Sequence, residues 1–453
     1  MIQAEVGRDP RAPSLAVAVA RRGEVLWEEA FGWADKEEGI RANEHTVYSL
    51  ASISKPITAT GLMVLASEGR IGLDEPVNRY LGAAKLTARV GRAEEATVRR
   101  VANHTSGLPL HYQFFYADEA YPVPTPEETI RRYGRLVAAP GERYEYSNLG
   151  YGVLGYLIER VSGQGFAEFM RERVFEPLGL RRMWIGNGAI GAAVRYDDDG
   201  RPIPDYDVDH PGASSAFASV HDLLRFGMFH AKAGGRAAVL DEAAIEAMQI
   251  PTAETLDGGG YGIGWSIEER DGYRRVSHTG GMGGVRTVLV LVPSEGIVVA
   301  ALCNGPSSLP MRVSDEILAM MLPRRGGEGL AAAPAKRLRF RPGPEWIGTW
   351  EGTLEDYRER HPVRVEITRA GEVMVELDGQ PRAAMAGVRW SDGSVTGRVP
   401  VSIDTEDAER TRHFVILTLK LRGDVLNGPA TAITYPGKRV GNAVTSFVEL
   451  RMR

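Results

Sequence analysis

A serine and a lysine three positions apart form the first group that could do chemistry. Ser52 and Lys55 stand in the stretch Ser-Ile-Ser-Lys, directly before an apolar run at 56–67 with the character of a helix. Residues three apart on a helix face the same side, so a neutral lysine there can take the proton of the serine hydroxyl. The pair predicts Ser52 as a nucleophile and Lys55 as its base. Ser54 competes for the first role, but it is adjacent to Lys55 and points to another side of the helix.

Tyr146 and Asn148 form the second group. They follow Pro-Gly-Glu at 140–142 and precede a helical stripe of apolar residues at 154–161. A tyrosine beside a lysine can act as an acid or base, and an amide can hold a substrate carbonyl. Taken alone, the stretch Tyr-Ser-Asn is explained more simply by a helix N-cap, where serine and asparagine are favoured.

The third group is Ser-His-Thr-Gly-Gly at 277–281, between two strand-like segments. Glycines there let the backbone approach a ligand and present an N–H to a developing oxyanion. A turn at the end of a strand would explain the same glycines, and a single histidine is more often structural than catalytic. We take His278 as a catalytic candidate, and Thr279, Gly280 and Gly281 as candidates for binding the substrate.

The three groups together are more specific than any one of them, because short motifs arise by chance. They occur in a fixed order, on a helix start, a helix cap and a strand edge. Other catalytic signatures are missing from the sequence: there is no Gly-x-Ser-x-Gly elbow, no nucleotide-binding glycine loop in a strand–helix context and no His-Glu-x-x-His. The combination predicts nucleophilic catalysis by a serine.

Two acidic stretches, at 197–199 and 205–209, need a separate interpretation. Asp205, Asp207 and Asp209 resemble the start of a calcium loop, but His210 stands where that loop needs glycine. We interpret both stretches as a solvated acidic loop and predict no metal site. If this loop borders the cleft, it favours cationic substrates, such as a free peptide amino terminus.

The composition excludes several classes of protein. Of 453 residues, 43% are hydrophobic and 25% charged, and 54 basic against 59 acidic residues give a net charge of −5. These values are typical of a globular protein without a nucleic-acid partner. No apolar run approaches the roughly 20 residues of a membrane span. The single cysteine, Cys303, excludes an intramolecular disulfide. No signal peptide is visible, which favours the cytoplasm, or the periplasm or secretion if a leader was removed.

The elements that must position these groups follow a strand–helix–strand order. Thr125 and Ser219 are expected N-caps within the helical part. A helical subdomain that interrupts a sheet, without repeated βαβ crossovers, predicts an α+β fold. The expected elements are strands at 15–20 and 24–31, a helical stretch at about 52–229, strands at 262–268, 285–292 and 296–304, and a helix at 314–322.

The last quarter of the chain has a different texture. A glycine-, proline- and alanine-rich stretch follows residue 323, and beyond it apolar residues alternate with period two almost to the end, for example at Val363, Val365 and Ile367. Such alternation predicts a small antiparallel β-barrel or sandwich. We therefore predict a hydrolase domain at 1–325, a linker at 326–344 and a barrel domain at 345–453.

With these motifs the chain resembles the serine β-lactamase and penicillin-binding-protein superfamily, especially its class C-like esterase and peptidase branch. The stretches His-Thr-Ser-Gly-Leu-Pro at 104–109 and Phe-Glu-Pro-Leu-Gly at 175–179 also match that branch. The resemblance covers about residues 10–325. The C-terminal segment resembles the lipocalin-like domains of some of these hydrolases, with less motif support.

The resemblance implies a role for each motif residue. Ser52 would be the acylated nucleophile, Lys55 its base, and Tyr146 the group that passes the proton to the leaving group. Asn148 would orient the substrate amide. The backbone N–H groups of Ser52 and Gly281 would form the oxyanion hole. No metal or organic cofactor is expected.

His278 departs from the family pattern. Dedicated β-lactamases and transpeptidases usually have lysine there, which helps to bind a substrate carboxylate. Histidine is mostly neutral at pH 7, so recognition of that carboxylate should be weaker here. His278 is also a candidate to assist Tyr146 in proton transfer.

The sequence therefore predicts a serine hydrolase that acts through an acyl-enzyme on small esters, amides or peptides, with weak β-lactamase activity compatible with the site. A D-amino-acid peptidase and a peptide-cyclising acyltransferase are the alternatives. An alternative of another class is a penicillin-binding sensor or assembly protein with little turnover. A homo-oligomer is left open.

Overall fold

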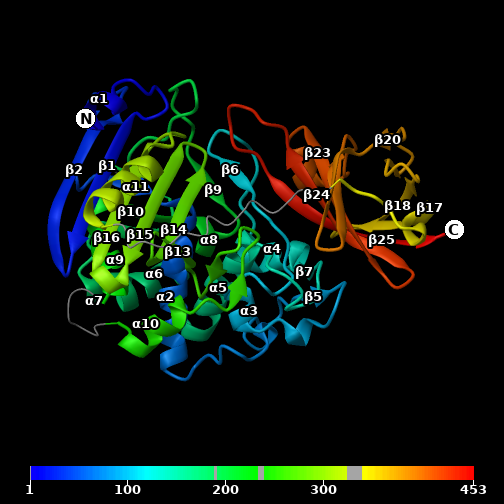
Figure 1. Ribbon diagram of the computed structural model, residues 1–453, viewed down its shortest axis with the longest axis horizontal. Coiled ribbons are helices and arrows are strands. Elements are labelled where there is room, and N and C mark those ends of the chain that lie inside the picture. Colours follow the sequence, from blue (N-terminus) through cyan, green and yellow to red (C-terminus); the bar gives the residue numbers. More distant parts are fainter. Residues whose placement is uncertain (1, 188–190, 233–238, 324–338) are drawn as a thin grey trace.

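The computed structural model describes residues 2–187, 191–232, 239–323 and 339–453. A nine-stranded antiparallel sheet forms the centre of the first part (Figure 1). The N-terminal strands and the segment after the helical insert meet in it, because β1 pairs with β16 as well as with β2. In spatial order its strands are β11 (Ala253–Glu254), β12 (Gly260–Tyr261), β13 (Ser266–Arg270), β14 (Tyr273–Met282), β15 (Val285–Val292), β16 (Ile297–Cys303), β1 (Ser14–Arg21), β2 (Glu24–Asp35) and β3 (Ile40–Arg41).

The centre of this sheet is apolar on both faces. Alternate residues of a strand point to opposite faces, and β1 follows this rule: Ala16 and Ala18 pack in one apolar cluster and Leu15 and Val17 in another. Helix α9 (Val220–His230) contributes to the first cluster, and helix α11 (Leu309–Met321) to the second. The sheet is therefore a middle layer between helices, as the α+β prediction required.

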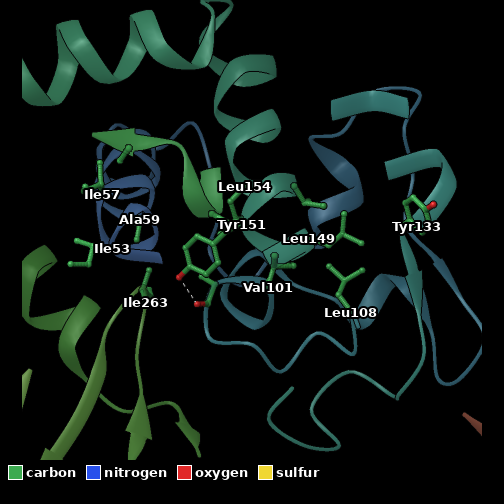
Figure 2. Packing of buried hydrophobic residues seen from close by; sticks show 14 of the residues in the cluster. Ile53, Ile57, Ala59, Val101, Leu108, Tyr133, Leu149, Tyr151, Leu154 and Ile263 are labelled. Carbon is green, nitrogen blue, oxygen red and sulfur yellow. Dashed lines mark hydrogen bonds between the residues drawn. The ribbon is translucent and has the colours of Figure 1, made fainter. Parts of the chain in front are cut away.

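The helical insert lies against one face of the sheet. Its core surrounds α2, which is buried along most of its length, and Figure 2 shows Ile53, Ile57 and Ala59 beside Tyr151 and Leu154 of α5. The remaining helices of the first part are α1 (Ile2–Val6), which precedes the sheet, and α2 (Ser54–Ser67), α3 (Val98–Ala102), α4 (Pro126–Tyr133), α5 (Asn148–Ser162), α6 (Phe166–Met170), α7 (Glu176–Leu178), α8 (Pro211–Ser214) and α10 (Glu242–Gln249). Short strands accompany them: β4 (Val47–Ser49), β5 (Thr87–Ala88), β6 (Phe114–Tyr116), β7 (Arg135–Leu136), β8 (Met183–Ile185), β9 (Tyr206–Val208) and β10 (Ala216–Ser219).

Both expected N-caps are confirmed. The Thr125 hydroxyl accepts from the backbone N–H of Glu128, whose carboxylate accepts in return from Thr125, which makes a capping box. The Ser219 hydroxyl accepts from the N–H of Asp222 at the start of α9.

Two expected elements are wrong in their bounds. The strand predicted at 262–268 is broken between β12 and β13, where Gly264 has a φ of 85° and an added Cβ would lie 2.7 Å from the Cβ of Ala59. The backbone turns here because it packs directly against α2. The last helix begins at Leu309, earlier than predicted, since Pro310 fits in the first turn of a helix.

The C-terminal part is a second antiparallel sheet of nine strands, nearly closed into a barrel (Figure 1). Val363, Val365 and Ile367 all point into its core, as their alternation predicted. Its strands in spatial order are β20 (Ala383–Ala384), β19 (Val373–Leu377), β18 (Arg360–Ile367), β17 (Gly348–Glu355), β25 (Ala443–Met452), β24 (Val425–Thr434), β23 (His413–Arg422), β22 (Ser394–Val399) and β21 (Ala386–Ser391), with one helix, α12 (Glu406–Glu409). Residues 326–338 of the predicted linker lie outside the described residues.

The barrel docks on the helical insert. Tyr112 exchanges two backbone hydrogen bonds with Ala443, of 3.0 and 2.8 Å, at the start of β25. The Tyr116 hydroxyl donates to the carbonyl of Val440, and Val440 packs on an apolar cluster that includes Phe114. The segment between β24 and β25 is thereby held against the first part of the molecule. Within the described ranges no helix combines the length and apolar character of a membrane span.

Candidate functional site

The turn before α2 brings Ser52 and Lys55 together, as their spacing predicted. Ser52 lies in a 3-10 turn, η1 (Ala51–Ile53), between β4 and α2. The Nζ atom of Lys55 lies 3.1 Å from the Ser52 Oγ, 2.8 Å from Oδ1 of Asn148 and 3.3 Å from the carbonyl oxygen of Ala213. Lys55 is fully buried, and burial holds its pKa well below the usual value. A neutral amine beside a hydroxyl is the arrangement that a lysine base requires.

Ser54, the competing serine, has a structural role. Its hydroxyl donates to the Ala51 carbonyl at 2.6 Å and accepts from the N–H of Ala216 at 2.9 Å. These bonds tie the turn η1 to β10. The side chain of Ser54 is therefore committed to holding the turn in which Ser52 lies.

Tyr146 and Asn148 flank a helix cap, so the N-cap interpretation of their motif is confirmed. Ser147 is the N-cap of α5, and its hydroxyl accepts from the N–H of Gly150 at 3.0 Å. Tyr146 hydrogen-bonds to Ser52, and its ring centroid lies 4.6 Å from the Nζ of Lys55. Burial raises the pKa of Tyr146, whereas the bond to Ser52 lowers it. The cap thus directs one neighbour to the serine and the other to the lysine.

The strand β14 closes the opposite side of the site. Its pairing with β13 ends at Ser277, so from His278 onward it pairs with β15 alone. Gly280 lies against the turn before Ser52, because an added Cβ would be 2.2 Å from the Leu50 carbonyl oxygen. A side chain there would push the strand away from Ser52. The glycine is therefore required by packing within the protein, whereas the predicted approach to a ligand stays a prediction.

His278 is buried and neutral. Its Nδ1 donates to the carbonyl of Thr279 at 2.7 Å, so its Nε2 is the acceptor for the Tyr261 hydroxyl at 3.0 Å. Burial and the nearby Lys55 lower the pKa of His278 to about 3. Its ring nitrogens therefore contact Thr279 and Tyr261, and the direct partner expected for it, Tyr146, is not among them.

Two cavities share Ser52, Tyr146 and Gly281 as a common wall. One, of 490 Å³, is also lined by Asn148, His210, Arg286 and Lys438. The other, of 520 Å³, is lined by Tyr144, Asp257, Tyr261 and His278 among others. A hydroxyl between two cavities can be approached by a substrate whose two halves occupy different spaces. A larger hollow of 1020 Å³ lies beside β11–β13, and Ser52 is not among its lining residues.

His104 also belongs to the site. The sequence identifies it only as the first residue of the motif at 104–109, without a role. Its φ is 64°, and its Nδ1 accepts from the backbone N–H of Ser147 at 3.1 Å. The ring packs 4.5 Å from that of Tyr146 and 4.8 Å from that of Tyr261. His104 therefore fixes both the cap residue and the tyrosine before it. The signal was the motif His-Thr-Ser-Gly-Leu-Pro itself.

The interpretation of 205–209 as a solvated loop is wrong for its last residue. Asp209 is buried, and its carboxylate accepts from Nδ1 of His210, Nε2 of His111 and Nε2 of Gln113, at 2.7, 2.7 and 3.0 Å. Residues 206–208 form β9, in which Asp207 is exposed, and the chain bends directly after this strand, at Asp209. The hydrogen bonds and charges of the two histidines hold the pKa of Asp209 below its usual range against the effect of burial. Within the described part of the chain, no group of metal-ligating side chains is arranged to hold an ion.

Comparisons with known proteins agree with this geometry. A family model described as Beta-lactamase matches residues 2–320. Penicillin-binding protein 4* of Bacillus subtilis (strain 168) is 26% identical over 299 residues, 60% of this chain and 64% of that protein, so the match spans less than two thirds of that relative. Esterase EstB of Burkholderia gladioli is 34% identical over 210 residues, 44% of this chain and 53% of that protein.

A solved structure extends the likeness to the C-terminal part. The octameric penicillin-binding protein homologue from Pyrococcus abyssi has a TM-score of 0.61 and 24% identity, and the match covers 98% of both chains. At this identity the likeness concerns the fold alone. The family match covers most of the chain and all the residues that surround Ser52 in the hydrolase part. The chain therefore belongs to the beta-lactamase family of serine hydrolases.

Proposed function

We propose that the protein hydrolyses small esters, amides or peptides through an acyl-enzyme on Ser52. The observation that carries the proposal is the 3.1 Å separation between the Ser52 Oγ and the buried Nζ of Lys55. A lysine in water is protonated at pH 7 and cannot serve as a base. Burial removes that obstacle, because it disfavours the charged form.

The reaction divides into two steps. Lys55 takes the proton of Ser52 while Oγ attacks the substrate carbonyl, and Tyr146 donates its proton to the leaving group as the bond to that group breaks and regains a proton from Lys55. The backbone N–H groups of Ser52 and Gly281 stabilise the oxyanion. Water then attacks the acyl-enzyme. The side-chain hydroxyl between the two cavities is the point at which acyl and leaving groups separate.

The charges of the first cavity bear on the substrate. Neutral His278 cannot anchor a carboxylate by charge, but Arg286 and Lys438 line the same cavity as Ser52. Lys438 lies 3.9 Å from the Asp199 carboxylate, and Asp197 and Asp198 also line the cavity, so its charge is mixed. In the described part of the structure no carboxylate pairs with Arg286, whose Nη1 donates to the Val285 carbonyl at 2.9 Å. We propose that this guanidinium takes a carboxylate on the half of the substrate that lies in this cavity, whereas the other cavity, lined by neutral His278, has no cationic side chain among its described lining residues to hold the carboxylate of a β-lactam.

Kinetics with paired substrates test the proposal. Hydrolysis of p-nitrophenyl butyrate and of nitrocefin is compared for the wild type, Ser52→Ala and Ser67→Ala, a control at the far end of the same helix. We expect the ester to be turned over, nitrocefin to be cleaved slowly, and Ser52→Ala alone to abolish both. Mass spectrometry should locate the acyl group on Ser52. Full activity of Ser52→Ala would overturn the nucleophile.

A D-amino-acid peptidase or a peptide-cyclising acyltransferase is the second candidate, favoured by the cationic Arg286 in the cavity beside Ser52. Either reaction presents a peptide carboxylate or a peptide amine to the site. Product analysis with D- and L-aminoacyl p-nitroanilides and an added amine distinguishes hydrolysis from transfer. A sensor with little turnover would instead give one equivalent of product and stop.

A further inference from the structure

A buried carboxylate lies behind one wall of the Ser52 cavity. Asp209 receives hydrogen bonds from His210 on one side and from His111 and Gln113 on the other, and all four side chains are almost completely enclosed. A buried carboxylate is costly unless its oxygens are satisfied, so this one is a built feature. Of the two histidines that it holds, His210 is the one that lines the cavity.

The backbone fixes where His210 stands. It directly precedes α8, whose Ala213 carbonyl accepts from Lys55 and whose Gly212 carbonyl accepts from the Thr58 hydroxyl at 2.7 Å. On the other side Gly152 of α5 makes room for it, because an added Cβ there would lie 3.1 Å from the Cβ of His210. His210 therefore lies between α2, which carries Lys55, and α5, which carries Asn148.

Asp209 also fixes the tautomer of His210. A carboxylate accepts hydrogen bonds only, so Nδ1 of His210 carries the hydrogen in their 2.7 Å contact. A neutral ring protonated at Nδ1 leaves Nε2 as an acceptor. Burial, the main influence, and the charges of His111 and Lys55 lower the pKa of His210, while Asp209 raises it, and the net shift is downward. The ring is thus available as a neutral base near pH 7.

We propose that His210, oriented by Asp209, accepts the proton of the water that hydrolyses the acyl-enzyme on Ser52. Lys55 and Tyr146 then serve acylation, and His210 serves deacylation from the cavity that it shares with Ser52 and Tyr146. This inference rests on the proposed acyl-enzyme and names the base for its second half.

The step balances in protons and bonds. The water oxygen forms a bond to the acyl carbon, and one water proton passes to Nε2 of His210. The tetrahedral intermediate collapses, the bond between the acyl carbon and Oγ breaks, and its electron pair returns to Ser52. The proton held by His210 then moves to Oγ, and the product leaves as the carboxylic acid, which carries the other water proton. Asp209 stays ionised and stabilises the imidazolium.

Separate measurement of the two half-reactions tests this role. His210→Asn keeps a donor for Asp209 near the position of Nδ1 and removes Nε2. With p-nitrophenyl butyrate in a stopped-flow instrument, we expect the burst rate to stay within about threefold of wild type. We expect steady-state turnover to fall about 100-fold, the usual effect of losing a general base. Acyl-Ser52 should then accumulate to near one equivalent by intact mass.

His111→Gln is the matched control, since it perturbs the same carboxylate from the side away from the cavity. It should change both phases alike or neither. Added imidazole should restore turnover to His210→Gly, a response that a structural role would not give. If His210→Asn slows burst and turnover equally, or changes neither, or if imidazole restores nothing, the proposal is wrong. Absence of any acyl-enzyme in the wild type would instead contradict the proposed function.

Discussion

Lys55 and Asp209 are both fully buried ionisable side chains of one site, yet burial affects them in opposite ways. Lys55 contacts a hydroxyl, an amide oxygen and a carbonyl oxygen, and its pKa is lowered toward the neutral form. Asp209 contacts two histidines and a glutamine amide, and its pKa is lowered toward the charged form. The hydrogen-bond partners of each side chain, and not how deeply it is buried, decide whether its neutral or its charged form is stable.

The difference shows how one site can hold a neutral base and a fixed anion close together. Desolvation penalises any charge, and a group without a counter-charge responds by becoming neutral. A group with several donors keeps its charge. In the proposed mechanism the lysine is therefore the reactive group, while the carboxylate orients its neighbour.

The largest effect should come from making the lysine permanently charged. Lys55→Arg places a guanidinium that cannot lose its proton in the same pocket, so it cannot take the proton of Ser52. We expect kcat/KM for p-nitrophenyl butyrate to fall at least about 1,000-fold, near the upper range for a general base. Lys232→Arg, in an ion pair with Glu246 away from the site, is the control and should keep full activity. Retention of a tenth of the activity would disprove the role of neutral Lys55.

The converse change removes the charge of the carboxylate. Asp209→Asn presents an amide N–H₂ to side chains that already donate, so we expect a loss of about 3 kcal/mol in the free energy of unfolding. Asp207→Asn, two residues earlier and exposed, should cost less than about 1 kcal/mol. Urea unfolding followed by circular dichroism measures both. Equal losses would show that the charge of Asp209 is not what the network requires.

A smaller effect concerns pH. The pKa values of His230 and His278 are lowered to about 3, mainly by burial. The unfolded chain therefore binds more protons below pH 6.5, and stability is lost as pH falls toward 3. Between pH 7.5 and 5.5 each such histidine should remove about 1.4 kcal/mol of unfolding free energy. His361, whose pKa is raised between Asp356 and Asp378, acts in the opposite direction.

Urea unfolding at the two pH values checks this slope. His230 is suited to the comparison because its Nε2 contacts the Thr60 hydroxyl and its Nδ1 has no partner in the described structure. His230→Gln should keep the first contact and reduce the pH dependence by one histidine. An unchanged slope in this variant would mean that His230 is not held neutral.

The smallest effect should come from a partly exposed carboxylate. Glu142 accepts from Lys420 and from Arg422 of the barrel, the latter at 2.9 Å, and its pKa is lowered to about 2. Because solvent screens such a cluster, Glu142→Gln should cost about 1 kcal/mol or less. The loss should shrink in 0.5 M sodium chloride. A loss as large as that of Asp209→Asn would erase the contrast between buried and exposed partners.

The sequence was sufficient to group Ser52, Lys55, Tyr146 and the glycine-rich strand, because their motifs carry their own spacing. It did not reveal the Asp209–His210 pair. An alternation of acidic and apolar residues is as typical of a solvated loop as of a short strand followed by a buried carboxylate. Only the contacts with His111 and Gln113, about a hundred residues away, decide between them.

Element bounds were predictable where a local signal marks them and not where tertiary packing sets them. Thr125 and Ser219 cap their helices through local hydrogen bonds. The strand is broken at Gly264 because α2 packs closely against it. No residue near Gly264 in the sequence signals this contact. The same holds for the cavities around Ser52, since their walls come from distant segments.

The segment between β24 and β25 separates two kinds of residues along the sequence. Gly437, Lys438 and Val440 line the Ser52 cavity, although they lie more than 380 residues after the serine and belong to the barrel. Residues that form this wall of the Ser52 cavity are therefore encoded far from the proposed catalytic residues. Substitutions, insertions or deletions in this one loop can alter which molecules fit while leaving α2, α5 and β14 intact. Mutation and selection can thus change the substrate range without changing the proposed catalytic residues.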